Sequence, residues 1–200
     1  MGLFDRFKKK KGKAAGEAAV QMEEAVAEEI NYQGLIEVAG ILTDNDSESL
    51  SIIRLLVEDP KRFDRLWEDW LDEIDFSAET LPDLIAAYWL TGYDTMQNFG
   101  AYIDWKEETS EILWGLEPGI QTKGYLLDFD DLSFTGEEYT DEALYMIAHY
   151  VKSKGYTLVY WDTSSDCYHL FVIPANKFEP LVALGKTMKL DFKTFLEPPR

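Results

Sequence analysis

The stretch YWDTSSDCYHLF, residues 160–171, holds the side chains of this chain that are best suited to chemistry. It contains the only cysteine, Cys167, and one of two histidines, His169, with Asp162 nearby. A cysteine and a histidine work as nucleophile and base when they approach within hydrogen-bonding distance. Residues two apart on a strand are separated by about 6.7 Å, and their side chains run parallel. We therefore do not expect a thiol enzyme, and a small-molecule enzyme using Asp162, Cys167 and His169 remains the alternative.

A metal site would need more ligands than Cys167 and His169 supply. Asp128 and Asp162 could add carboxylates, but the spacing matches neither CxxC nor HxxxH. The acidic run at 127–131 lacks the Asp-x-Asp-x-Asp-Gly loop and the closing Glu of an EF-hand. We expect no metal and no other cofactor.

The same stretch has the pattern of a β-hairpin with a four-residue loop at 163–166. Such a loop would place Asp162 opposite Cys167 and Tyr160 opposite His169. In this register the mixed polar side chains share one face of the sheet, and the apolar side chains share the other. The polar face is then expected to meet solvent or a partner.

The segment at 14–95 is predicted to be mostly helical, from its helix formers, its apolar spacing and its capping residues. Ser47 is the expected cap of one helix, and the tryptophan-rich stripe of another is expected to lie in the core. The helices are predicted over residues 14–30, 33–42, 47–59, 60–74 and 78–92.

The pattern changes near Phe99, where apolar and polar residues begin to alternate. Strands are predicted over residues 99–105, 125–129, 156–162 and 167–173. Helices are predicted over residues 109–117, 140–155 and 178–188. This order predicts the α+β class, with a four-stranded mixed sheet and helices mainly on one face.

Three segments follow from these patterns. Residues 1–13 form a basic tag, residues 14–95 a helical region, and residues 96–200 an α/β sheet region. The sheet region is expected to form one compact unit with residues 32–95, because the chain is of a size for one or two units.

Charge divides the chain into two unequal parts. The tag MGLFDRFKKKKGK carries +5, which leaves −24 on the other 187 residues. An anionic body repels phosphates, so we exclude nucleic acid as a partner. The acidity favours a basic protein partner through long-range steering, although solubility alone also explains it.

The tag raises the alternative of a peripheral membrane protein. Leu3, Phe4 and Phe7 would share one face of a short helix, and Lys8 to Lys11 follow at once, which suits weak contact with an anionic membrane surface. A frayed, solvated terminus is the simpler interpretation. With a single cysteine, no apolar run of about 20 residues and no apolar segment of a secretory signal, the sequence predicts a cytoplasmic protein.

Alternation also predicts a binding surface made of tyrosines and aspartates. Tyrosine supplies contact area at low entropic cost, and aspartate complements a basic partner. An ordinary solvated face is the alternative. The predicted binding residues are Tyr102, Asp104, Asp128, Tyr160, Asp162 and His169.

Two stretches, YIDWKEETSEILWGLEP and YTLVYWDTSSDCYHLFVIP, resemble an uncharacterised bacterial family catalogued only as a domain of unknown function. The resemblance covers roughly residues 80–195 and rests on structural motifs. It implies a bacterial cytoplasmic protein and transfers no site residues. In composition and style the chain is also similar to acidic immunity proteins that neutralise bacterial toxins. The expected function is protein–protein binding, as an immunity-type inhibitor or an adaptor.

Overall fold

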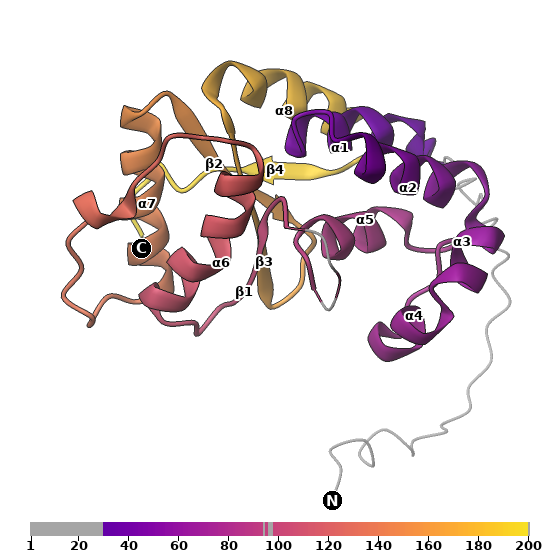
Figure 1. Cartoon of the computed structure of the whole chain (residues 1–200), viewed down its shortest axis with the longest axis horizontal. Helices are drawn as coiled ribbons and strands as arrows, with labels where there is room; N and C mark the ends of the chain where they lie inside the picture. Colours follow the sequence, from indigo (N-terminus) through magenta and orange to yellow (C-terminus); the bar gives the residue numbers. More distant parts are fainter. Residues whose placement is uncertain (1–29, 94, 96–97, 200) are drawn as a thin grey trace, which may run out of the picture.

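The computed structural model describes residues 30–93, 95 and 98–199 (Figure 1). The basic tag and the helix predicted for residues 14–30, except for Ile30, lie outside these residues. The predicted membrane contact through the tag therefore rests on the sequence alone.

Within the described residues, the first half of the chain is helical and the strands lie in the second half beside further helices, which confirms the α+β class. The first half holds α1 (Leu35–Leu42), α2 (Ser47–Glu58), α3 (Pro60–Leu66), α4 (Glu68–Ile74) and α5 (Pro82–Leu90). The later helices are α6 (Thr109–Thr122), α7 (Thr140–Ser153) and α8 (Phe178–Thr187). The strands are β1 (Ala101–Asp104), β2 (Tyr156–Asp162), β3 (Cys167–Pro174) and β4 (Asp191–Lys193). Short 3₁₀ turns are η1 (Tyr32–Gly34), η2 (Phe129–Asp131) and η3 (Ala175–Lys177).

Local sequence explains where α2 and α3 begin. The carboxylate of Asp46 accepts a hydrogen bond from the Ser49 backbone N at 2.8 Å, so Asp46 caps α2 instead of Ser47. Asp59 caps α3 through its side chain, and Pro60 takes the first helical position, where no N–H is needed.

The helix predicted over residues 60–74 is interrupted at Trp67, whose φ of −123° separates α3 from α4. Aromatic rings from both helices surround Trp89 of α5. The ring centroids of Phe63 and Trp67 lie 6.2 and 5.1 Å from that of Trp89. The stripe is therefore core, as predicted, except that Leu66 is 58% exposed.

The strands form one sheet in the order β1-β3-β2-β4, and every neighbouring pair is antiparallel. The prediction of a mixed sheet is wrong. The strand predicted over residues 125–129 does not form, because Tyr125 donates its backbone N–H to Ile120 at the end of α6 and Asp128 caps η2. The fourth strand is β4, whose three residues are too few for an alternating pattern to stand out.

Most of the helices lie on one face of the sheet, as predicted, and α6 and α7 cover the other face (Figure 1). Helices α1 to α5 and α8 pack on one face around a first hydrophobic cluster, and α6 and α7 pack on the other around a second. The hairpin strands contribute to both, since Val159 and Phe171 enter the first cluster and Leu158 and Val172 enter the second.

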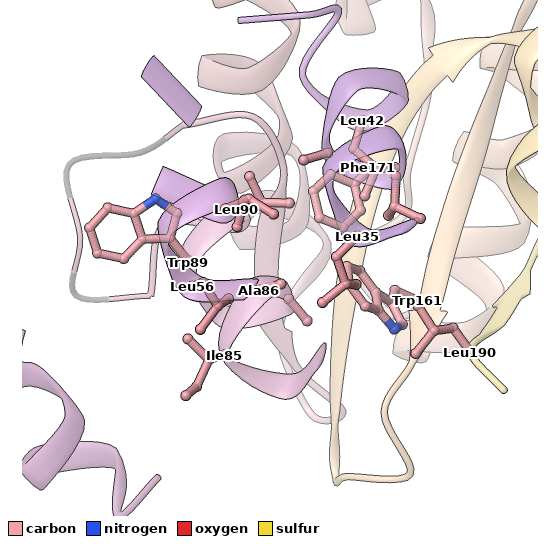
Figure 2. Packing of buried hydrophobic residues seen from close by; sticks show 14 of the residues in the cluster. Leu35, Leu42, Leu56, Ile85, Ala86, Trp89, Leu90, Trp161, Phe171 and Leu190 are labelled. Atoms are coloured by element: carbon pink, nitrogen blue, oxygen red, sulfur yellow. The ribbon is translucent and has the colours of Figure 1, made fainter. Parts of the chain in front are cut away.

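The first cluster joins the helical half of the chain to the sheet. Figure 2 shows Leu35 of α1 between Phe171 and Trp161 of the hairpin. All three side chains are at most 1% exposed. Burying a side chain of this size contributes about 1.5–3 kcal/mol, so these contacts hold α1 firmly on the sheet.

The hairpin register differs from the predicted one by one residue. Trp161 pairs with His169, and Tyr160 pairs with Leu170. Because side chains alternate between faces, a slip of one residue moves each side chain of β2 to the other face relative to the side chains of β3. His169 therefore points under the first group of helices and is 0% exposed, instead of sharing an open face with Tyr160.

Helix α6 continues through Pro118, where the sequence predicts its end. A proline inside a helix removes one hydrogen bond, but Leu116 and Ile120 on either side of it are buried in the second cluster. Gly119 allows the close approach to the chain before β1, since a Cβ there would lie 2.9 Å from the backbone carbonyl of Phe99.

Lys123, the residue that follows α6, joins three segments of the fold. Its Nζ donates hydrogen bonds to the carbonyl oxygens of Val172 at 2.7 Å, Phe99 at 2.9 Å and Leu42 at 3.3 Å. Leu42 ends α1, where helix carbonyls have no helical partner. Burial lowers the pKa of Lys123 to about 7, against an opposing effect of Asp44.

Candidate functional site

The fold brings Cys167 and His169 together with three residues that are distant in sequence. Helix α5 supplies Tyr88, Thr91 follows at its end, and β1 supplies Tyr102, which pairs with His169 across the sheet. We call these five residues the thiol cluster. Cys167 is only 5% exposed, so the cluster lies beneath the hairpin and not on an open face.

The sulfur of Cys167 lies 3.6 Å from Nε2 of His169. This distance corrects the expectation that the two side chains run parallel without approaching. Strand side chains lean along the strand direction, so two residues on the same face can meet although their backbones are separated.

The hydrogen-bond network assigns the tautomer of His169. The hydroxyl of Thr91 donates its proton to the carbonyl of Ala87 at 2.8 Å, so this proton is not available for His169. The contact of 3.1 Å between Thr91 Oγ1 and His169 Nδ1 therefore has Nδ1–H as the donor. Nε2 is then unprotonated, and it accepts the proton of the Cys167 thiol.

Burial and hydrogen bonding perturb the titratable groups of the thiol cluster. Burial lowers the pKa of His169 to about 4, so the ring is neutral at pH 7. Burial, followed by the interaction with Cys167, raises the pKa of Tyr88 to about 12 and also raises the pKa of Tyr102. Both phenols therefore keep their protons at neutral pH.

The predicted binding residues do not share one surface. Tyr102, Asp104 and His169 lie on the face covered by the first group of helices, since Tyr102 pairs with His169 and Asp104 pairs with Cys167. Of these three, only Asp104 is exposed; Tyr102 is half-buried and packs its ring on Tyr93 at a centroid distance of 4.6 Å.

The other three predicted residues lie on the opposite face or beyond the sheet. Tyr160 is half-buried among residues of the second cluster, and its hydroxyl donates to Asp162 at 3.1 Å. Asp162 also forms an ion pair of 2.6 Å with Lys193. Burial alone would raise the pKa of Asp162, but the bonds from Lys193, Ser164 and Tyr160 hold it below its usual value. Asp128 is exposed and caps η2.

A groove of about 600 Å³ lies between the turn after β1 and the start of α7. Trp105 and Tyr139 are 52% and 78% exposed. We call this groove the acidic-aromatic groove. Its lining residues are Trp105, Lys106, Glu107, Glu108, Glu138, Tyr139, Thr140, Asp141 and Tyr168.

Local hydrogen bonds give the acidic-aromatic groove its shape and charge. The Thr140 hydroxyl donates to the Glu107 carbonyl at 3.1 Å and so connects the two walls. The carboxylate of Glu138 accepts hydrogen bonds from Thr135 and from the backbone N of Gly136. These bonds, led by that of the Thr135 backbone, lower the pKa of Glu138 to about 2 and keep its charge fixed.

Sequence reasoning does not find this groove, because the alternation after Phe99 assigns Trp105 to the buried face. The strand ends at Asp104, whose side chain accepts a hydrogen bond from the Lys106 backbone N at 2.9 Å and so forms a turn. The charged run that follows, Lys106 to Glu108, is the signal that could have indicated this turn.

The described residues contain neither a membrane-spanning helix nor a cluster of metal ligands. None of the helices there has the length and apolar character needed to cross a bilayer. In the same residues, no group of three or more His, Cys, Asp and Glu side chains is arranged to hold a metal ion.

The fold and its sites define an α+β protein with an antiparallel sheet enclosed between two helical layers. The chain belongs to the family described as a domain of unknown function, DUF6630, whose model matches residues 34–195. The resemblance expected for residues 80–195 is thus confirmed and extends through the N-terminal helices. Comparisons with curated proteins and with solved structures find no match to this chain.

Proposed function

We propose that this protein binds a basic segment of a partner protein in the acidic-aromatic groove. The observation that supports this is the exposure of Trp105 and Tyr139 beside Glu107, Glu108 and Glu138. Aromatic residues enriched at interfaces provide the contact area, and the carboxylates provide attraction and orientation. The negative charge of the whole body steers a basic partner toward the protein.

The chain itself provides an example of a cation on this surface. Nζ of Lys106 lies 4.3 Å from the ring centroid of Trp105. A cation over an indole face is attracted by the ring, by about 0.5–1 kcal/mol at an exposed site. Because Lys106 is exposed, its ammonium can move away and leave the ring face to a lysine or arginine of the partner.

A surface of this kind would serve an immunity-type inhibitor or an adaptor in a bacterial cytoplasm. Both act by covering a basic surface of another protein, and neither needs a deep pocket with converging catalytic groups.

The test is an NMR titration of the ¹⁵N-labelled protein with a ten-residue peptide of alternating lysine and alanine. We expect shifts at Trp105, Glu108 and Tyr139, and weaker binding as salt rises. Exposed ion pairs contribute roughly 0.2–1 kcal/mol each. Reversing two charges with Glu107→Lys and Glu108→Lys should therefore weaken binding about tenfold.

Two controls separate groove binding from general attraction to a polyanion. The pair Asp69→Lys and Glu73→Lys, exposed on α4, changes the net charge by the same amount and should leave the affinity nearly unchanged. Lys106→Ala removes the competing ammonium and should tighten binding. Equal loss of affinity in both double variants, or equal shifts with a glutamate–alanine peptide, would refute the proposal.

A further inference from the structure

The surroundings of the Cys167 sulfur combine one proton acceptor with several hydroxyl groups. Nε2 of His169 lies 3.6 Å away and accepts the thiol proton. The hydroxyl of Ser165 lies 3.0 Å from the sulfur, and the phenols of Tyr88 and Tyr102 are close enough to interact with it. An acceptor removes the proton, and the donors stabilise the negative charge that then develops on sulfur.

His169 is held in the orientation that this chemistry needs. Thr91 accepts from Nδ1–H and is itself fixed by its bond to Ala87, so Nε2 stays directed at the sulfur. The arrangement of nucleophile, base and orienting residue is the one by which weak nucleophiles are activated. The proposed binding of a basic partner does not require this arrangement of Cys167, His169 and Thr91.

We propose that Cys167 is a peroxide-reactive thiol, with His169 as its base and Thr91 as the residue that positions His169. The thiol proton passes to Nε2 as the sulfur attacks one oxygen of hydrogen peroxide. The O–O bond breaks, and the leaving hydroxide takes the proton from Nε2 and becomes water. Sulfur is oxidised by two electrons to the sulfenic acid, Cys–SOH, and the peroxide is reduced.

The access to the thiol defines the class of substrate. Cys167 is 5% exposed, and the hydroxyl of the exposed hairpin residue Ser165 contacts its sulfur. So little exposed surface excludes a bulky substrate and restricts the oxidant to a small uncharged molecule. The chain has no second cysteine, so the sulfenic acid does not resolve into an internal disulfide and awaits a small external thiol.

The test is the rate at which the native protein is oxidised by hydrogen peroxide. Trapping with dimedone and intact mass measurement report Cys167 without ambiguity, because it is the only cysteine. We expect His169→Leu to slow the reaction roughly a hundredfold, the usual contribution of a positioned base. Tyr102→Phe keeps the ring and removes the phenol hydroxyl that interacts with the sulfur, so it should slow the reaction about tenfold.

The pH profile provides a readout that a purely structural role would not change. Because burial lowers the pKa of His169 to about 4, Nε2 stays free to accept the thiol proton above that pH, and the native rate should be nearly constant from about pH 5 to pH 8. The facing titratable groups, Tyr88 from α5 and Tyr102 from β1, stay protonated there, and Asp104 opposite Cys167 is exposed to solvent. In the unfolded protein the rate should fall about tenfold per pH unit below the usual thiol pKa.

Two results would overturn the proposal. One is labelling of Cys167 only after unfolding, which would make it an inert core residue. The other is a wild-type rate in folded Tyr102→Phe together with a native pH profile that follows that of the unfolded chain. Near-ultraviolet circular dichroism confirms the folding of each variant, and Tyr102→Phe decides the question if His169→Leu does not fold.

Discussion

Replacing Lys123 by methionine tests whether its amine is held out of water by three carbonyl groups. Methionine has a similar length and no charge, so Lys123→Met removes the hydrogen bonds to Val172, Phe99 and Leu42 while filling much of the same space. Lys123 as a whole is of intermediate exposure, but its Nζ faces these carbonyls, and burial lowers the pKa to about 7.

The sign of the pH dependence follows from that lowered pKa. Between pH 7 and the ordinary value of 10.5, the unfolded chain holds the proton more tightly than the folded protein. The free energy of unfolding therefore rises with pH across this window. For Lys123 alone the rise from pH 7 to pH 9 is about 2 kcal/mol. Lys123→Met lacks this contribution, so the stability difference between wild type and variant should grow by that amount.

Urea unfolding of both proteins at pH 7 and pH 9 measures this change. The same difference should appear as a relative shift of about 4–8 °C in Tm for a chain of this size. Lys186→Met on the exposed side of α8 serves as the matched control and should show no such pH dependence. An equal stability loss for Lys123→Met at both pH values would show that the ammonium is well solvated, and the reasoning would fail.

Two further predictions concern packing and acid stability. Gly119→Ala should lower the free energy of unfolding in urea by about 1–3 kcal/mol, because the new Cβ would lie 2.9 Å from the Phe99 backbone. Gly115→Ala would meet only side chains and should lower it by less. Equal losses in the two variants would contradict this prediction. His169 has a pKa lowered from 6.5 to about 4, so stability should fall by about 3 kcal/mol as pH decreases through that window. A folded His169→Leu variant should lose this slope, and an unchanged slope would rule out His169 as its source.

The hairpin shows why sequence patterns identify strands better than registers. Leu158 and Val159 are both buried, as are Phe171 and Val172, so either register buries apolar side chains on one face. The pattern therefore predicts both strands but does not distinguish pairing of Tyr160 with His169 from the observed pairing with Leu170. That slip of one residue changes His169 from an exposed binding residue to the buried base of the thiol cluster.

The parts of the sites that the sequence does not predict depend on tertiary contacts. Thr91 and His169 are separated by 78 positions, and only the packing of α5 on the sheet brings them together. The walls of the acidic-aromatic groove meet through Thr140 and Glu107 in the same way. By contrast, the helices near Asp46 and Pro60 depend on local caps, which the sequence predicts to within one residue.

The placement of one sheet between two separate cores has a consequence for partial unfolding. If α6 and α7 open while the first cluster stays intact, the hairpin remains supported from one side, and the reverse opening leaves it supported from the other. Amides of β2 and β3 should then exchange with solvent only when both layers are lost, whereas helix amides exchange through local openings. The slowest exchanging amides would therefore be those of the hairpin. The acidic-aromatic groove lies at the end of β1 and the start of α7, so it could change shape without unfolding the protein.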